Sequence, residues 1–117
     1  YNSCSVDFLR DIHRDYDSRQ IVFEFKNVRA VEGRHINQLN RYLTHEFGRF
    51  GVLVTRNRLP LPMLQNTLDL WAGQRRCIIA LADRDLELMT TVFESKQRLP
   101  IDVLKARYIQ FTRACPA

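Results

Sequence analysis

A carboxylate and an ammonium group stand two residues apart in an otherwise apolar stretch, as Glu24 and Lys26 of residues 20–27. The neighbouring residues are β-branched or aromatic, which predicts a strand, and the side-chain period of two places both charges on one face. Such charges are costly there unless they pair or bind something. A carboxylate suited to Mg²⁺ beside a cation suited to a phosphate or a water is half of a metal-dependent phosphodiesterase site. The alternative is a cross-strand ion pair on a solvated face.

Two further polar residues, Gln38 and Tyr42, follow at helical spacing. Because they are four residues apart, they share one face of the expected helix, while Leu39 and Leu43 serve its apolar side. A helix that follows a strand packs back over the sheet, so this polar face is expected to overlook Lys26 and a bound phosphate. The alternative is that Gln38 and Tyr42 only face water.

The elements that must position these residues follow from hydrophobic periodicity and turn signals. The expected order is α-β-α-β-α-β-α-α, and strands separated by helices imply parallel pairing with right-handed crossovers in an α/β sandwich. Asp83 and Asp102 are the expected caps of the last two helices, with Asp85 as a partner of the helix dipole, and Gly48 is expected to close the second helix. The charged strand is expected to be central in its sheet. The three histidines are expected at the surface and not as metal ligands, and they are His13, His35 and His45. Helices are expected at residues 7–16, 32–46, 60–72, 83–95 and 102–111, and strands at 20–26, 51–55 and 77–81.

Composition fits one ordinary globular domain, with 117 residues, 45% hydrophobic and 26% charged. The net charge is +5, and the stretch from Arg10 to Arg76 alone carries +5, which is what a nucleic-acid face needs. A mildly basic surface is the alternative. No apolar run approaches the roughly 20 residues that cross a bilayer. Three widely spaced cysteines form neither a disulfide framework nor a zinc spacing, so we expect a cytoplasmic protein.

Three segments together resemble the PD-(D/E)XK, or restriction endonuclease-like, nuclease superfamily, and the later segments resemble members found in bacterial defence proteins. The resemblance runs from about Asp7 to Phe111. It implies a three-layer sandwich around a mixed sheet, with this chain as one domain, residues 1–117, that lacks the N-terminal strands of the fold. The segments are Glu24-Phe25-Lys26-Asn27, Ile36-x-Gln38-x-x-x-Tyr42-Leu43 and Gly51-Val52-Leu53-Val54-Thr55-Arg56.

The resemblance also implies roles for individual residues. The carboxylate of Glu24 and the carbonyl of Phe25 would bind Mg²⁺, with Mn²⁺ as an alternative ion. Lys26 would orient or activate the attacking water, and Gln38 would lie near the scissile phosphate. The nucleic-acid contacts are expected at four other residues, which are Asn27, Tyr42, Arg56 and Arg58. For the two arginines, an ordinary surface loop is the alternative.

Members of this family carry an aspartate on the strand that precedes the Glu-x-Lys strand, which here is the strand with Glu24 and Lys26. This sequence has no aspartate on such a strand. Asp7, Asp11 and Asp15 follow a helical pattern, and Asp17 stands in a turn before the strand. We expect the missing aspartate to lie upstream of Tyr1, in a longer multidomain protein. Asp17 as the ligand and an incomplete site are the alternatives. A single carboxylate would leave a weak Mg²⁺ site.

The sequence therefore predicts a Mg²⁺-dependent nuclease domain acting on nucleic acid, with DNA as the expected substrate, and an effector of a prokaryotic defence system as one setting. Two rival hypotheses are a catalytically inactive relative that binds nucleic acid and a protein-interaction module. The expected partners are nucleic acid and other domains of the same parent chain, with a second copy as a further candidate and no membrane.

Overall fold

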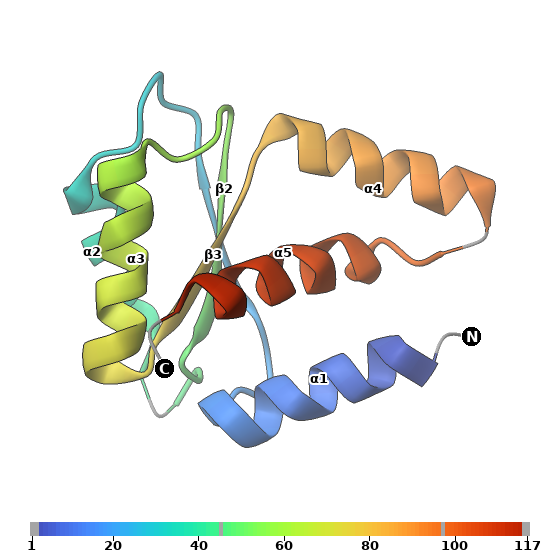
Figure 1. Cartoon of the computed structure of the whole chain (residues 1–117), viewed down its shortest axis with the longest axis horizontal. Coiled ribbons are helices and arrows are strands. Elements are labelled where there is room, and N and C mark those ends of the chain that lie inside the picture. Colours follow the sequence, from blue (N-terminus) through green and yellow to red (C-terminus); the bar gives the residue numbers. More distant parts are fainter. Residues whose placement is uncertain (1–2, 45, 97, 116–117) are drawn as a thin grey trace.

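The computed structural model describes residues 3–44, 46–96 and 98–115, and its elements follow the predicted order (Figure 1). Three helices and three strands alternate, and two further helices follow them. Their bounds are α1 (Ser3–Tyr16), β1 (Val22–Lys26), α2 (Gly33–Tyr42), β2 (Phe50–Thr55), α3 (Leu61–Gln74), β3 (Cys77–Leu81), α4 (Asp83–Ser95) and α5 (Ile101–Ala114). The α/β class predicted from the sequence is confirmed. Among these helices, none is both long enough and apolar enough to cross a membrane.

The three strands form one sheet in the order β1-β2-β3. Both pairings are parallel, with Glu24 opposite Leu53 and Lys26 opposite Thr55. The expected mixed sheet is therefore not seen in the described part of the chain. There β1 is an edge strand, whereas the charged strand was expected to be central.

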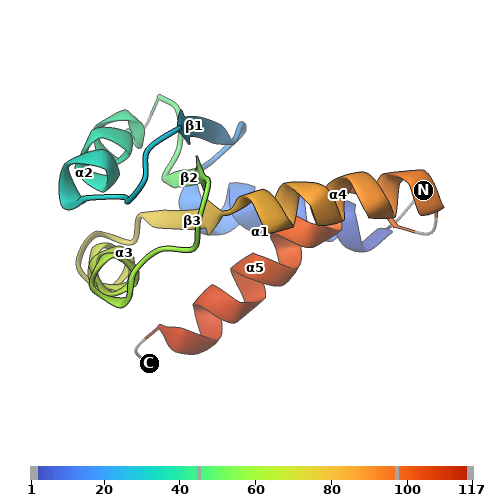
Figure 2. The ribbon, with the colours of Figure 1, turned by 90° about the horizontal axis from the view of Figure 1, so that it is seen from above.

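Helices cover both faces of this sheet because its middle strand is apolar up to its last residue, Thr55. Every residue of β2 is buried, as expected for a parallel strand between two helical layers. Phe50, Val52 and Val54 face one core, which α1 and α5 complete, whereas Leu53 faces the core beneath α2. Figure 2 shows α2 and α3 on one side of the sheet and α1, α4 and α5 on the other.

The second helix starts as predicted but ends early. Glu32 is its N-cap, and His35 Nδ1 accepts a hydrogen bond from the Glu32 amide at 2.9 Å. The helix ends at Tyr42 instead of Glu46. Gly48 belongs to the following turn with φ +94°, and a Cβ there would lie 2.5 Å from the Ser18 Cα, so the position requires glycine.

The caps of the last two helices were only partly predicted. Ala82, not Asp83, is the N-cap of α4, and the Asp85 carboxylate accepts the Ala82 amide at 2.9 Å. In α5, the Asp102 carboxylate accepts the Leu99 amide at 3.0 Å. At both helix starts an aspartate thus accepts a hydrogen bond from a main-chain N–H, but this aspartate lies in the first turn of the helix and is not the N-cap residue.

Hydroxyl and indole groups connect three helices inside the core that α1 and α5 share. The hydroxyls of Tyr16 and Tyr108 lie 3.1 Å apart, and Trp71 Nε1 donates to the Tyr16 hydroxyl at 3.1 Å. Burial raises the pKa of both tyrosines and of the neighbouring Cys77 thiol, so all three groups stay neutral at ordinary pH. These bonds position helices and offer no reactive base.

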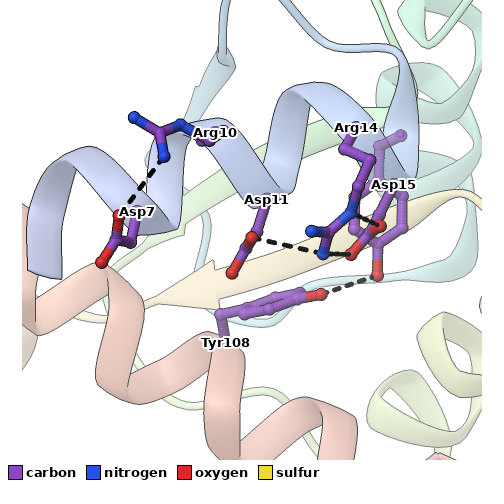
Figure 3. A network of polar contacts seen from close by, with 7 residues as sticks. Asp7, Arg10, Asp11, Arg14, Asp15 and Tyr108 are labelled. Carbon is purple, nitrogen blue, oxygen red and sulfur yellow. Dashed lines mark hydrogen bonds and ion pairs between the residues drawn. The ribbon is translucent and has the colours of Figure 1, made fainter.

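The outer face of α1 carries a ladder of ion pairs (Figure 3). Arg14 lies 3.2 Å from Asp11 and 2.8 Å from Asp15, and Arg10 lies 3.9 Å from Asp7. Because these side chains are largely exposed, the pairs add little to stability. These ion pairs give each of the three helical aspartates a partner on α1 itself, so none of them needs a role beside Glu24.

The tyrosine contacts predict a graded loss of stability. Tyr16→Phe removes the acceptor of Trp71 and the partner of Tyr108, so the free energy of unfolding should fall by about 1–3 kcal/mol. Tyr108→Phe removes one contact and should cost about 0.5–1.5 kcal/mol. Urea unfolding measures both, with the exposed Tyr42→Phe as the control that should change little. Equal losses in all three variants would contradict this account.

Candidate phosphodiesterase site on the edge strand

The pairing register turns the charges of β1 toward the α2 side of the sheet. Glu24 lies opposite Leu53, and Leu53 and Val22 belong to the core beneath α2. The alternating period therefore directs Glu24 and Lys26 to that side, where their side chains are 24% and 21% exposed. Phe23 and Phe25 point to the other side and are 46% and 69% exposed.

Gln38 reaches this pair from the neighbouring helix. Ile36 and Leu39 are fully buried and fix the rotation of α2 against the sheet. That rotation leaves the Gln38 amide over β1, where its Oε1 accepts a hydrogen bond from Lys26 Nζ at 2.9 Å. Lys26 Nζ also lies 3.1 Å from Glu24 Oε1. We call these three residues the Glu24–Lys26–Gln38 cluster.

The chemistry of lysine fixes how the amide is oriented. An ammonium group only donates, so the Gln38 oxygen must face Lys26 and the Nε2 hydrogens must face elsewhere. Lys26 has three donors and uses two in these contacts, so one N–H is left for a third acceptor. Glu24 keeps its second oxygen. The cluster can therefore offer a carboxylate oxygen, an ammonium N–H and amide N–H groups at one place.

The other predicted contact residues come from the carboxyl ends of two strands and from α2. Asn27 follows β1 and Arg56 and Arg58 follow β2, so all three lie at the carboxyl ends of the strands, and all are exposed. Tyr42 is the last residue of α2 and is 50% exposed. It lies one helical turn beyond Gln38, about 6 Å along the axis, on the way to the amino ends. The first three thus lie at the same end of the sheet as Lys26, where Arg58 also lines a cavity with Asp85 and Arg107.

Asp17 lies at the opposite end of β1 from Lys26. It is exposed with φ +53°, and the preceding Tyr16 carbonyl accepts the Arg49 amide at 2.9 Å, just before β2 begins. Arg49 precedes Leu53, the partner of Glu24, by four residues, which is about 13 Å along a strand. The described arrangement therefore does not bring Asp17 to Glu24.

The cluster suits a hard divalent cation in part. The Glu24 carboxylate and the adjacent Phe25 carbonyl are oxygen ligands of the kind that Mg²⁺ prefers. Across the described ranges, no three His, Cys, Asp or Glu side chains come together as a metal-binding group. A Mg²⁺ ion at these two oxygens would therefore need further ligands.

Sequence reasoning missed two buried polar residues. His35 was expected at the surface but is buried as the capping partner of Glu32, whereas His13 is exposed and His45 lies outside the described residues. Asp85 was interpreted as a helix-start residue only. Its carboxylate also accepts a hydrogen bond from Arg107 Nε at 2.6 Å. The 22-residue separation explains the miss, because no local pattern connects the two.

Comparison with known proteins gives one partial likeness. A 56-residue stretch is 34% identical to the "Putative transposon gamma-delta 80.3 kDa protein" of Escherichia coli (strain K12). It covers 48% of this chain but only 8% of that protein, so the two share a fragment and not their whole length. No protein-family model matches the chain, and no solved structure matches it.

The Asp85–Arg107 contact predicts a stability effect that is absent at surface carboxylates. Asp85→Asn leaves the Ala82 amide an acceptor but removes the charge opposite Arg107. We expect the free energy of unfolding to fall by about 1–3 kcal/mol, short of a fully buried pair because Arg107 is 29% exposed. The matched control is Asp69→Asn, an exposed helical acid. Denaturant unfolding measures the free energy of unfolding of both variants, and equal losses would show that the Asp85–Arg107 contact does not add to stability.

Proposed function

We propose that this chain is a restriction endonuclease-like nuclease domain that hydrolyses phosphodiester bonds of DNA with Mg²⁺. The observation that carries the proposal is the Glu24–Lys26–Gln38 cluster, in which Lys26 Nζ lies within hydrogen-bonding distance of both other side chains. An ordinary cross-strand ion pair would need no glutamine from a separate helix. Partial burial of both charges also favours a site over a solvated face.

The free N–H donors of Lys26 and Gln38 suggest a separate catalytic role for each residue. The remaining Lys26 N–H can hold the attacking water in line with the phosphorus, and Gln38 Nε2 can donate to a phosphoryl oxygen. Both groups would stabilise negative charge as it grows in the transition state. Their positions are fixed before substrate arrives, because Glu24 and the packed face of α2 hold them.

Glu24 and the Phe25 carbonyl are the residues that would hold the metal ion. When bound, Mg²⁺ supplies a Lewis acid for the phosphoryl oxygens and lowers the pKa of water. In the described part of the chain, Glu24 does not belong to any group of three or more His, Cys, Asp or Glu side chains, and we therefore propose a further ligand from a preceding segment.

DNA is proposed as substrate for two reasons. Asn27, Arg56 and Arg58 are exposed where the strands end, at the same end of the sheet as Lys26, and arginine forks suit phosphates. The partial likeness is to a protein named for a transposon, which is a DNA element. A bacterial defence protein is the setting that we propose for the intact parent, with its other domains as partners.

A second candidate function is binding without cleavage. The single carboxylate near Lys26 favours it, because a metal held by one acid is weakly held. The two functions differ in what Lys26 does. In a nuclease it acts in the transition state, whereas in a binding module it is one cation among several.

Paired substitutions separate chemistry from binding. In the intact parent, Lys26→Ala should slow single-turnover cleavage at least about 100-fold and leave DNA affinity nearly unchanged. Glu24→Gln keeps the shape but removes the charge, so it should abolish cleavage. Arg56→Ala should instead weaken binding to all sequences and reduce the salt slope by about one unit. Arg113→Ala, at an exposed arginine of α5, is the control. Unchanged cleavage in the first two variants would leave only the binding module.

The position of the missing ligand is tested by length. The 117-residue chain should bind Mg²⁺ weakly and cut DNA slowly or not at all. An extension by about 30–60 upstream residues, roughly a strand-and-helix unit, should restore both. Isothermal titration with Mg²⁺ and single-turnover cleavage measure the two properties. Full activity of the short chain would place the second ligand among its own acids.

A further inference from the structure

A cavity of about 300 Å³ follows the outer edge of β3, the strand at the other side of the sheet from Glu24. All of residues 78–82 line it, so it runs along the edge and not over one face. Leu64 and Thr67 of α3 form one wall, and Phe111 and Ala114 of α5 form the other. Figure 2 shows these helices on either side of β3. This volume is at the lower end of ligand sites, roughly 300–1,000 Å³, and suits a short segment.

The main chain of β3 presents paired donors and acceptors to this cavity. The Cys77 amide donates toward β2, to the Arg49 carbonyl at 2.9 Å. Because the direction of main-chain groups alternates along a strand, Ile79 also turns toward β2, while Ile78 and Ala80 turn outward. In the described part of the chain, β3 has no strand beyond it. The N–H and C=O groups of both residues therefore point toward the cavity, where Ala80 is partly exposed and Ile78 is buried, and buried main-chain groups require partners.

We call this cavity the slot, and its end near the carboxyl end of β3 is positively charged. Arg107 donates from Nε to Asp85 at 2.6 Å and from Nη1 to Gln110 at 2.8 Å. A guanidinium has five N–H donors, so its remaining donors are available to a ligand. Arg58 lines the same end and is exposed. Two cations against the one carboxylate of Asp85 favour an anionic group here.

We propose that this slot binds an extended peptide, which adds to β3 as a fourth strand and places a carboxylate at the Arg58–Arg107 end. A peptide strand offers main-chain groups at every second residue, which matches Ile78 and Ala80. Residues 78–82 span about 13 Å, so three to four peptide residues fill the edge. The carboxylate comes from a free C-terminus or from an acidic side chain. Peptide binding here does not use Glu24, Lys26 or Gln38, although Arg58 serves both proposals, as a DNA contact and as a partner of the peptide carboxylate.

The probe is a fluorescein-labelled hexapeptide of alternating valine and threonine with a free C-terminal carboxylate. Binding is followed by anisotropy and by the amide NMR shifts of Ile78 and Ala80. N-methylation of one alternate set of residues should weaken binding about threefold to tenfold per lost bond, and methylation of the other set should not. C-terminal amidation should weaken binding about tenfold. Recovery by an aspartate in the amidated peptide assigns the carboxylate to a side chain, and failure to recover assigns it to the C-terminus.

Variants of the chain test the slot itself. Ala80→Pro removes one outward N–H, which an edge strand tolerates, and Ala114→Trp fills the mouth from an exposed helical position. Both should abolish binding while circular dichroism and the melting temperature show a folded chain. Arg58→Gln should weaken binding about threefold to tenfold, and the control Arg113→Gln should not.

Three results would overturn the proposal. The first is unchanged peptide affinity in folded Ala80→Pro and Ala114→Trp. The second is a shift of the Ile78 and Ala80 amides by deoxyadenosine monophosphate and by none of the peptides, which would make the slot a nucleotide pocket. The third is concentration-dependent protection of both amides without peptide, which would identify a second copy as the occupant.

Discussion

Burial of β2 on both faces is the constraint on which the rest of this structure depends. A parallel strand with no polar face needs a helical layer on each side, so β2 requires α2 on one side and α1 with α5 on the other. The position of α2 then follows from Leu53, and the position of Gln38 follows from α2. A polar site at an edge is thus located by apolar packing in the middle of the sheet.

The elements and the cluster were predictable because both depend on local periodicity. Alternation in β1 and a spacing of three and four in α2 determine which way Glu24, Lys26 and Gln38 point, and a short strand-to-helix connection limits where α2 can lie. The early end of α2 at Tyr42 was not predictable, because Leu43 continues the apolar stripe. The turn after the helix is instead determined by the close approach of Gly48 to Ser18, a contact between distant residues that no local sequence pattern indicates.

Contacts between distant segments account for what the sequence did not reveal. Asp85 has an ordinary place in a first helical turn, and only the packing of α5 on α4 brings Arg107 to it. The same holds for Tyr16, Trp71 and Tyr108, which come from three helices and meet in one core. The order of the strands is likewise a tertiary property, so β1 was expected in the centre and lies at an edge. Polar groups that join remote elements set the geometry without leaving a periodic signal.

The placement of Phe23 and Phe25 has a consequence for how the isolated chain behaves in solution. Two largely exposed aromatic rings stand on an edge strand, and the charges of that strand are turned to the opposite face. Natural proteins usually protect such edges with lysine, proline or a covering segment. Here the lysine that would serve as a gatekeeper is engaged with Gln38. Colloidal stability at this edge therefore rests on the net charge of the whole chain, so its solubility should fall as salt screens that charge.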